Sequence, residues 1–143
     1  MFAPSKEAVR RFFCDTWRKA SSGDVLTPME TIAHDWMLQH PEYEPELSDL
    51  EAALAADYDA VHGATNPFLH LSMHLSISEQ IAIDQPPGIR DAFIRLAERR
   101  GSEHDAHHDI MECLGEMLWT SQRHGLPPDG ATYVDCVKRR SLA

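Results

Sequence analysis

Cysteine is scarce in this sequence, and its spacing suggests no pairing. The 143 residues contain three cysteines, Cys14, Cys113 and Cys136, and no two of them form a Cys-x-x-Cys motif. An odd number of widely separated cysteines predicts neither a disulfide framework nor a zinc site made of thiolates. This usage favours a cytoplasmic protein in which Cys113 is a small buried filler of the core.

Long apolar runs are also missing. The opening residues MFAPSKEAVRRFF lack the apolar core of a signal peptide. The most apolar stretch, residues 68–83, is interrupted by histidines, serines, a glutamate and a glutamine. The sequence therefore predicts neither export nor a membrane span, and we expect no membrane partner.

Positive charge is in deficit. The chain has 13 basic and 23 acidic residues, which gives a formal net charge of −10. Phosphate backbones are bound chiefly through Lys and Arg, so nucleic acid is not expected as a partner. An acidic excess favours solubility, and it also suits a basic protein partner.

The common catalytic motifs are absent as well. The sequence contains no glycine-rich phosphate loop, no His-Glu-x-x-His, no Gly-x-Ser-x-Gly and no acidic calcium loop. No reaction is indicated by a motif, and whether the protein is an enzyme stays open.

Helical periodicity is what the sequence does contain, and no segment alternates like a strand. Thr27 and Glu30 have the spacing of a capping box, and Pro28 suits the first turn of a helix. The helix that begins there must end before Pro41. The pattern predicts an all-α, single-domain helical bundle over residues 1–143. Its six or seven helices are expected near residues 5–21, 27–39, 48–57, 66–83, 89–100, 102–124 and 133–137.

Two of these helices each carry a histidine pair at four-residue spacing, which places both rings on one helix face. His70 and His74 form one pair, and His104 and His108 form the other, with Glu112 and Glu116 continuing the second series. A random scatter of nine histidines gives about 0.5 such pairs. The spacing therefore indicates a site built from histidines.

One metal ion between the two helices explains this pattern. Successive members of the second series drift by about 40 degrees around the helix, so only one adjacent pair can reach an ion. We choose His108 and Glu112, because His104 lies at the helix start, and join them to His70 and His74. Imidazole and carboxylate ligands suit zinc, iron, manganese or nickel without selecting among them.

A metal-free arrangement is equally open at this point. The same histidines can be interior or boundary residues hydrogen-bonded to neighbouring side chains or to the backbone, and Glu112 with Glu116 can be a solvated acidic pair. His107, near the centre of the apolar stripe of its helix, is expected to be a core histidine. The remaining histidines are predicted to lie at the surface or at loop ends: His34, His40, His62 and His124.

A central block of the chain resembles an uncharacterised bacterial family, domain of unknown function family eighteen-forty-one. The residues that carry the resemblance are Asn66-Pro-Phe-Leu-His70 with His74, Glu79-Gln80 and the DQPPGIR segment at 84–90. It extends through HPEY at 40–43 and through His108, Glu112, Glu116 and Trp119, and it covers about residues 30–135. The resemblance implies membership of that family and no particular activity.

Two functions of different classes follow. The first is a small cytoplasmic helical bundle with a His/Glu metal site that stabilises the fold or supports metal-dependent chemistry. The alternative is a metal-free acidic module that holds a protein partner in a groove or through the HPEY and DQPPGIR loops. Oligomeric state is left open by the sequence.

The charge balance generates a first prediction. We expect negligible affinity for duplex DNA at physiological salt, because the sequence offers no continuous basic stripe to replace phosphate counterions. A fluorescence anisotropy titration with a labelled duplex tests this. Sub-micromolar binding that weakens with salt would contradict it.

Overall fold

A computed structural model describes residues 5–58 and 66–143 of the chain. Every regular element in those residues is helical: eight α-helices and one 3-10 helix, η1. The all-α prediction is confirmed, but the predicted number of helices was one or two too low. One short helix, α3 (Glu44–Leu47), was not foreseen. It forms because the chain restarts a helical turn directly after η1 (Pro41–Tyr43).

The chain divides into two compact units, Met1–Leu75 and Ser76–Ala143. Helix α5 (Pro67–Ile83) contributes its first part to one and its last part to the other. We call these the N-terminal and C-terminal units and describe each by itself. The sequence-based prediction of a single domain over residues 1–143 stays a prediction.

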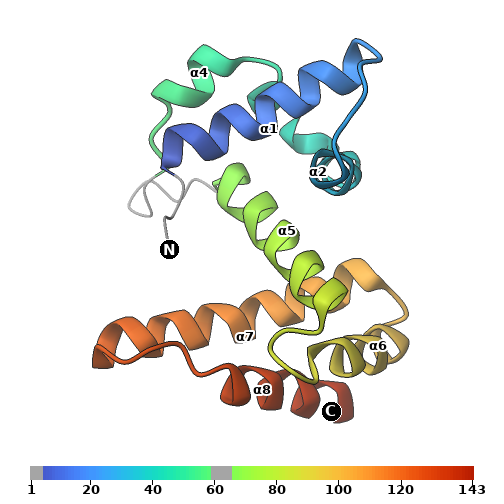
Figure 1. Cartoon of the computed structure of the whole chain (residues 1–143), viewed down its shortest axis with the longest axis vertical. Coiled ribbons are helices and arrows are strands. Elements are labelled where there is room, and N and C mark those ends of the chain that lie inside the picture. The colour runs from blue at the N-terminus through green and yellow to red at the C-terminus, as the bar shows by residue number, and fades with distance from the viewer. Residues whose placement is uncertain (1–4, 59–65) are drawn as a thin grey trace. The chain divides into compact units, whose positions relative to one another are not determined.

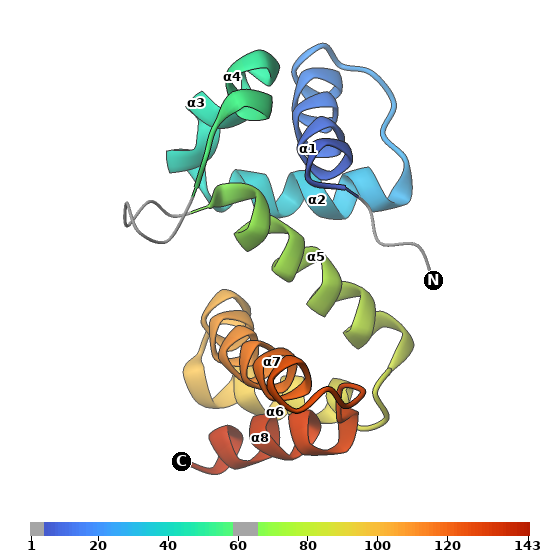
Figure 2. The same cartoon turned by 90° about the vertical axis from the view of Figure 1, so that its left-hand side faces the viewer.

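The N-terminal unit packs α1 (Lys6–Ser21) against α2 (Pro28–Leu38), α3 and α4 (Leu50–Ala55). Figures 1 and 2 show α1 and α2 crossing, with α3 and α4 beside them. Aromatic side chains of α1 face this core, where Phe13 is 1% exposed. The other buried members of the core are Cys14, Ala33, Trp36, Met37, Leu47, Ala53, Phe68 and Leu71.

The predicted capping box of α2 is present. The Thr27 hydroxyl accepts from the Glu30 backbone N–H at 3.1 Å, and Glu30 Oε1 accepts from the Thr27 backbone N–H at 2.9 Å. Lys19 of α1 donates to the other carboxylate oxygen of Glu30 at 2.9 Å. The cap therefore fixes the start of α2, and Lys19 ties that start to α1.

The C-terminal unit packs α6 (Ile89–Arg100), α7 (Glu103–His124) and α8 (Gly130–Leu142) against one another and includes the last part of α5. Gly101 ends α6 in a left-handed conformation, with φ of 72°. The Tyr133 hydroxyl of α8 donates to Gln80 Oε1 of α5 at 2.6 Å. The terminal helix is longer than predicted because Asp129 caps it through the backbone N–H groups of Ala131 and Thr132.

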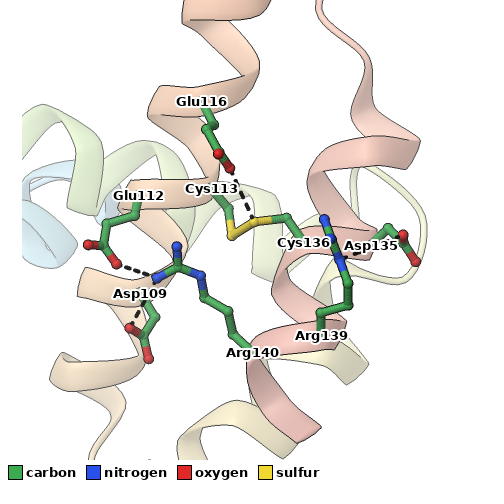
Figure 3. The surroundings of a disulfide bond; sticks show 8 residues. All are labelled: Asp109, Glu112, Cys113, Glu116, Asp135, Cys136, Arg139 and Arg140. Carbon is green, nitrogen blue, oxygen red and sulfur yellow. Dashed lines mark hydrogen bonds and ion pairs between the residues drawn. A yellow bond between two sulfur atoms is a disulfide. The ribbon is translucent and has the colours of Figure 1, made fainter. Parts of the chain in front are cut away.

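A disulfide joins α7 to α8, contrary to the sequence analysis (Figure 3). It links Cys113 to Cys136 with an S–S distance of 2.08 Å and a Cα–Cα distance of 5.9 Å. The two cysteines are 23 residues apart in sequence, and only the packing of α7 against α8 makes them neighbours. Cys113 is buried as predicted, but as half of a bond rather than as a free filler.

Among the described residues, no helix combines the length and the apolar character that a membrane crossing requires.

The capping box generates a second prediction. The Thr27 backbone hydrogen bond and the Lys19 hydrogen bond lower the pKa of Glu30 to about 2. The unfolded chain therefore binds more protons than the folded one between the ordinary glutamate pKa and about pH 2, so folding stability decreases as pH falls through that window. Glu30→Gln should lose stability at pH 7, and its difference from wild type should shrink as pH falls towards 2.

Urea denaturation at several pH values measures this difference. The matched control is Glu7→Gln, which removes an exposed acid that pairs with Arg11 on the same helix. If the difference in free energy of unfolding between Glu30→Gln and wild type is the same at pH 7 and near pH 2, the carboxylate does not act through its ionised form.

Candidate metal centre

His70 and His74 lie side by side on the part of α5 that belongs to the N-terminal unit. Asn66 caps this helix: its Oδ1 accepts from the backbone N–H groups of Phe68 and Leu69, each at 3.1 Å. The four-residue spacing places the two ring centroids 4.8 Å apart. His74 is fully buried and His70 is half-buried. As predicted, the spacing places both rings on one face of α5.

His40 completes a group of three. It follows the end of α2, where Pro41 prevents the helix from continuing. Its Nδ1 lies 2.7 Å from the Trp36 carbonyl oxygen. A carbonyl only accepts, so Nδ1 carries the hydrogen, and in the neutral ring the lone pair is on Nε2. That atom lies 3.2 Å from Nε2 of His70.

Aromatic rings hold the histidine rings in place. The Trp36 ring stacks on His74 with centroids 3.9 Å apart and an interplanar angle of 13°. The Tyr43 ring stacks on His40 at 5.1 Å and 4°. Burial, with Glu42 and Glu46 nearby, raises the pKa of Tyr43, so its hydroxyl stays neutral. Tyr43 also lies edge-on to His70, with ring centroids 6.1 Å apart. Aromatic packing thus contacts all three rings, as a prearranged ligand set requires.

The spacing of the ring nitrogens suits a small cation. The candidate ligand atoms of His40, His70 and His74 lie within 4.8 Å of one another. Tetrahedral zinc bound to imidazole at 2.0–2.1 Å would separate neighbouring nitrogens by about 3.3 Å. The 3.2 Å between His40 and His70 is close to this value. Without an ion, the same geometry allows a hydrogen bond in which His70 donates to His40.

The C-terminal unit holds the second predicted pair. His104 and His108 of α7 have ring centroids 4.5 Å apart, and their candidate ligand atoms also lie within 4.8 Å of each other. Ser102 caps this helix by accepting from the Asp105 backbone N–H at 3.1 Å. His104 is therefore held in a formed first turn, and the reason for leaving it out of the predicted ligand set does not hold.

Glu112 lies in a different environment from the histidines. Arg140 of α8 forms an ion pair with Glu112, and its guanidinium is 3.6 Å from Asp109 Oδ1 (Figure 3). The Glu112 side chain is 65% exposed. Its predicted role as a metal ligand stays a prediction, and the interaction that the structure gives it is electrostatic.

His107 is a core residue, as predicted. It is 3% exposed and lies edge-on to Phe93 with ring centroids 5.6 Å apart. Burial, together with His104 and His108, lowers the pKa of His107 to about 3, so this ring is neutral in the folded protein.

Sequence reasoning missed His40, which it placed at the surface. His40 does follow a helix end, but it is only 3% exposed. It is 30 residues from His70 and outside any periodic pattern, so spacing gave no sign of it. The one available signal was its position in HPEY, a segment of the family resemblance. Among the other histidines, His124 is exposed as predicted, and His62 lies outside the described residues.

Comparison with known proteins identifies the family and gives no activity. No curated protein and no solved structure matches the chain. A family model described as a domain of unknown function, DUF1841, matches residues 5–139, which include all three histidines of the N-terminal group. The chain belongs to this family, as the block from Asn66 to Arg90 indicated.

Proposed function

We propose that the N-terminal unit binds a divalent transition-metal ion through His40, His70 and His74. The observation that carries this proposal is the hydrogen bond from His40 Nδ1 to the Trp36 carbonyl. It directs the lone pair of Nε2 towards His70. Metal-binding histidines usually donate their second ring N–H to a carbonyl or carboxylate in this way.

Burial favours the same ligands. An imidazole binds a metal ion through its unprotonated ring nitrogen, and burial keeps bulk water from competing for the ion. His40 and His74 are 3% and 0% exposed. Three imidazole ligands would leave the full charge of the ion in place.

Three protein ligands would leave a fourth position for water or a substrate. A metal-bound water can supply a nucleophile near neutral pH, and an open metal position can also polarise a carbonyl or phosphoryl oxygen. The proposal therefore extends to metal-dependent hydrolytic or redox chemistry, with no substrate assigned. Zinc, iron, manganese and nickel are all compatible with imidazole ligands.

The predicted ligands of α7 remain part of the proposal to be tested. His108 forms a pair with His104, whereas Glu112 is engaged by Arg140. Substituting each of these residues separately decides whether α7 contributes a ligand to the ion.

Metal content gives the third prediction. Protein purified without an affinity tag should carry metal, or take up one equivalent of zinc, iron, manganese or nickel. His40→Ala, His70→Ala and His74→Ala should each lower occupancy sharply, because each removes one of three ligands. The double variant His40→Ala/His74→Ala should lose little more than either alone, since one site cannot be broken twice. Inductively coupled plasma mass spectrometry measures the occupancy.

The matched control is His124→Ala, which removes an exposed histidine at the end of α7. His108→Ala and Glu112→Gln test the sequence-predicted set. If both retain full occupancy while His40→Ala loses it, the ion is held by the N-terminal unit without either of them.

Thermal stability gives the fourth prediction. An ion that binds only the folded state stabilises it by about 2.7 kcal/mol when its concentration is 100 times Kd. Chelation should therefore lower the melting temperature of wild type and leave that of His40→Ala unchanged. Calorimetry with and without chelator measures both.

Wild type that carries no stoichiometric metal, gains none on incubation and melts identically in chelator would defeat the proposal. The acidic interaction module would then be the better hypothesis. For either function, the protein is predicted from its sequence to be cytoplasmic and to bind neither nucleic acid nor membranes.

A further inference from the structure

A pocket of about 410 Å³ opens between α7 and α8 in the C-terminal unit. Its walls include Trp119, Leu126 and Tyr133, together with both cysteines of the disulfide. Trp119 and Leu126 are 59% and 64% exposed, so the pocket is reached from solvent. Its volume is within the usual range for small-molecule sites.

The disulfide lies in the wall of this pocket, and its two cysteine residues differ in exposure. Cys136 is 8% exposed and Cys113 is 1% exposed. A nucleophile in the pocket therefore reaches Cys136 more readily. Cys113 would then be the leaving group.

A carboxylate lies beside the more accessible sulfur. Glu116 Oε2 is 3.7 Å from Cys136 Sγ (Figure 3). A disulfide sulfur has no hydrogen, so this contact becomes a hydrogen bond only when Cys136 is a thiol. The carboxylate is thus placed to accept from the reduced form, and its charge repels an anion that approaches the oxidised form.

The two helices are held together without the disulfide. Arg140 of α8 pairs with Asp109 and Glu112 of α7. Beside the bond, the apolar residues Ile110 and Val137 are both fully buried. Reduction would therefore leave α7 and α8 packed, which a reversible exchange requires.

We propose that Cys113–Cys136 is a thiol–disulfide exchange site, and that its co-substrate is a small neutral or cationic thiol bound in the adjoining pocket. The thiolate of the co-substrate attacks Cys136 Sγ, forms a mixed disulfide and releases Cys113 as a thiolate, which takes a proton from solvent. A second thiol attacks the co-substrate sulfur of the mixed disulfide and releases Cys136. Two thiols are oxidised to one disulfide, and the cysteine pair gains two electrons and two protons.

Charge selects the co-substrate. Arg139, the cation that lines the pocket, has its Nε 4.0 Å from Asp135, and Glu116 and Asp129 line the same pocket. An anionic thiol is therefore disfavoured, and Glu116 acts as a positioning residue that sets this preference.

The test compares three probes of similar size with the full-length protein: 2-aminoethanethiol, 2-mercaptoethanol and mercaptoacetate. Each reduction rate is divided by the rate of the same thiol with a small uncharged disulfide, which removes differences in intrinsic reactivity. We expect the cationic probe to exceed the anionic one by about fivefold or more. Glu116→Gln should reduce that ratio, whereas Glu103→Gln, an equal change of charge elsewhere on α7, should not.

Site preference is tested with single-cysteine pairs. Each variant, Cys113→Ser or Cys136→Ser, is treated with the oxidised form of 2-aminoethanethiol, and mass spectrometry follows the mixed disulfide. Cys136 in the first variant should react several times faster than Cys113 in the second. Cys14 serves as an internal control, because burial raises its pKa to about 11 and keeps it unreactive.

Three results would overturn the proposal. The first is a disulfide that resists millimolar thiol in the folded protein, or that does not form in the presence of the oxidised probe. The second is loss of the helical circular dichroism signal on reduction, which would make the bond a structural crosslink. The third is a probe ratio that Glu116→Gln leaves unchanged. None of these results bears on the metal content of the N-terminal unit, so the two proposals stand or fall separately.

Discussion

The metal site proposed for the N-terminal unit depends on the hydrogen bond between His40 and the Trp36 carbonyl. A buried imidazole must satisfy two nitrogens, and this bond satisfies one of them with a backbone group that cannot titrate. It thereby leaves the other nitrogen of His40 with a lone pair, 3.2 Å from His70. The Trp36 and Tyr43 rings then restrict the rotation of the imidazoles that they stack on. The capping box of α2 contributes by fixing the helix whose end presents His40.

The C-terminal unit depends on a different arrangement, in which two helices are joined both by a covalent bond and by noncovalent contacts. Disulfides in cytoplasmic proteins usually take part in catalysis or redox sensing, whereas structural disulfides belong to oxidising compartments. Arg140 and the buried apolar residues hold α7 to α8 independently of the cysteines. The proposed thiol–disulfide exchange at Cys113–Cys136 could therefore proceed while the two helices stay packed. A cytoplasmic location stays a prediction, and it agrees with that proposal.

Features encoded by neighbouring residues could be predicted from the sequence. The Thr27–Glu30 capping box and the shared face of His70 and His74 on α5 both depend on spacings of four residues or fewer along a helix. His40 and the Cys113–Cys136 bond could not be predicted in this way. His40 meets His70 across 30 residues, and the cysteines meet across 23. Both contacts depend on how whole helices pack, and no local period records that.

Charge connects the two proposed activities. The formal net charge of −10 attracts cations to the protein, and both proposals allow a cationic ligand, a metal ion in one unit and a small neutral or cationic thiol in the other. Surface attraction of this kind is screened over about 8 Å at physiological ionic strength, so it affects the rate of encounter more than the final affinity. Affinity must come from the local groups instead, from the His40, His70 and His74 lone pairs in one unit and from Glu116 in the other. Added salt should therefore slow association with each site, because it screens the long-range attraction of the net charge.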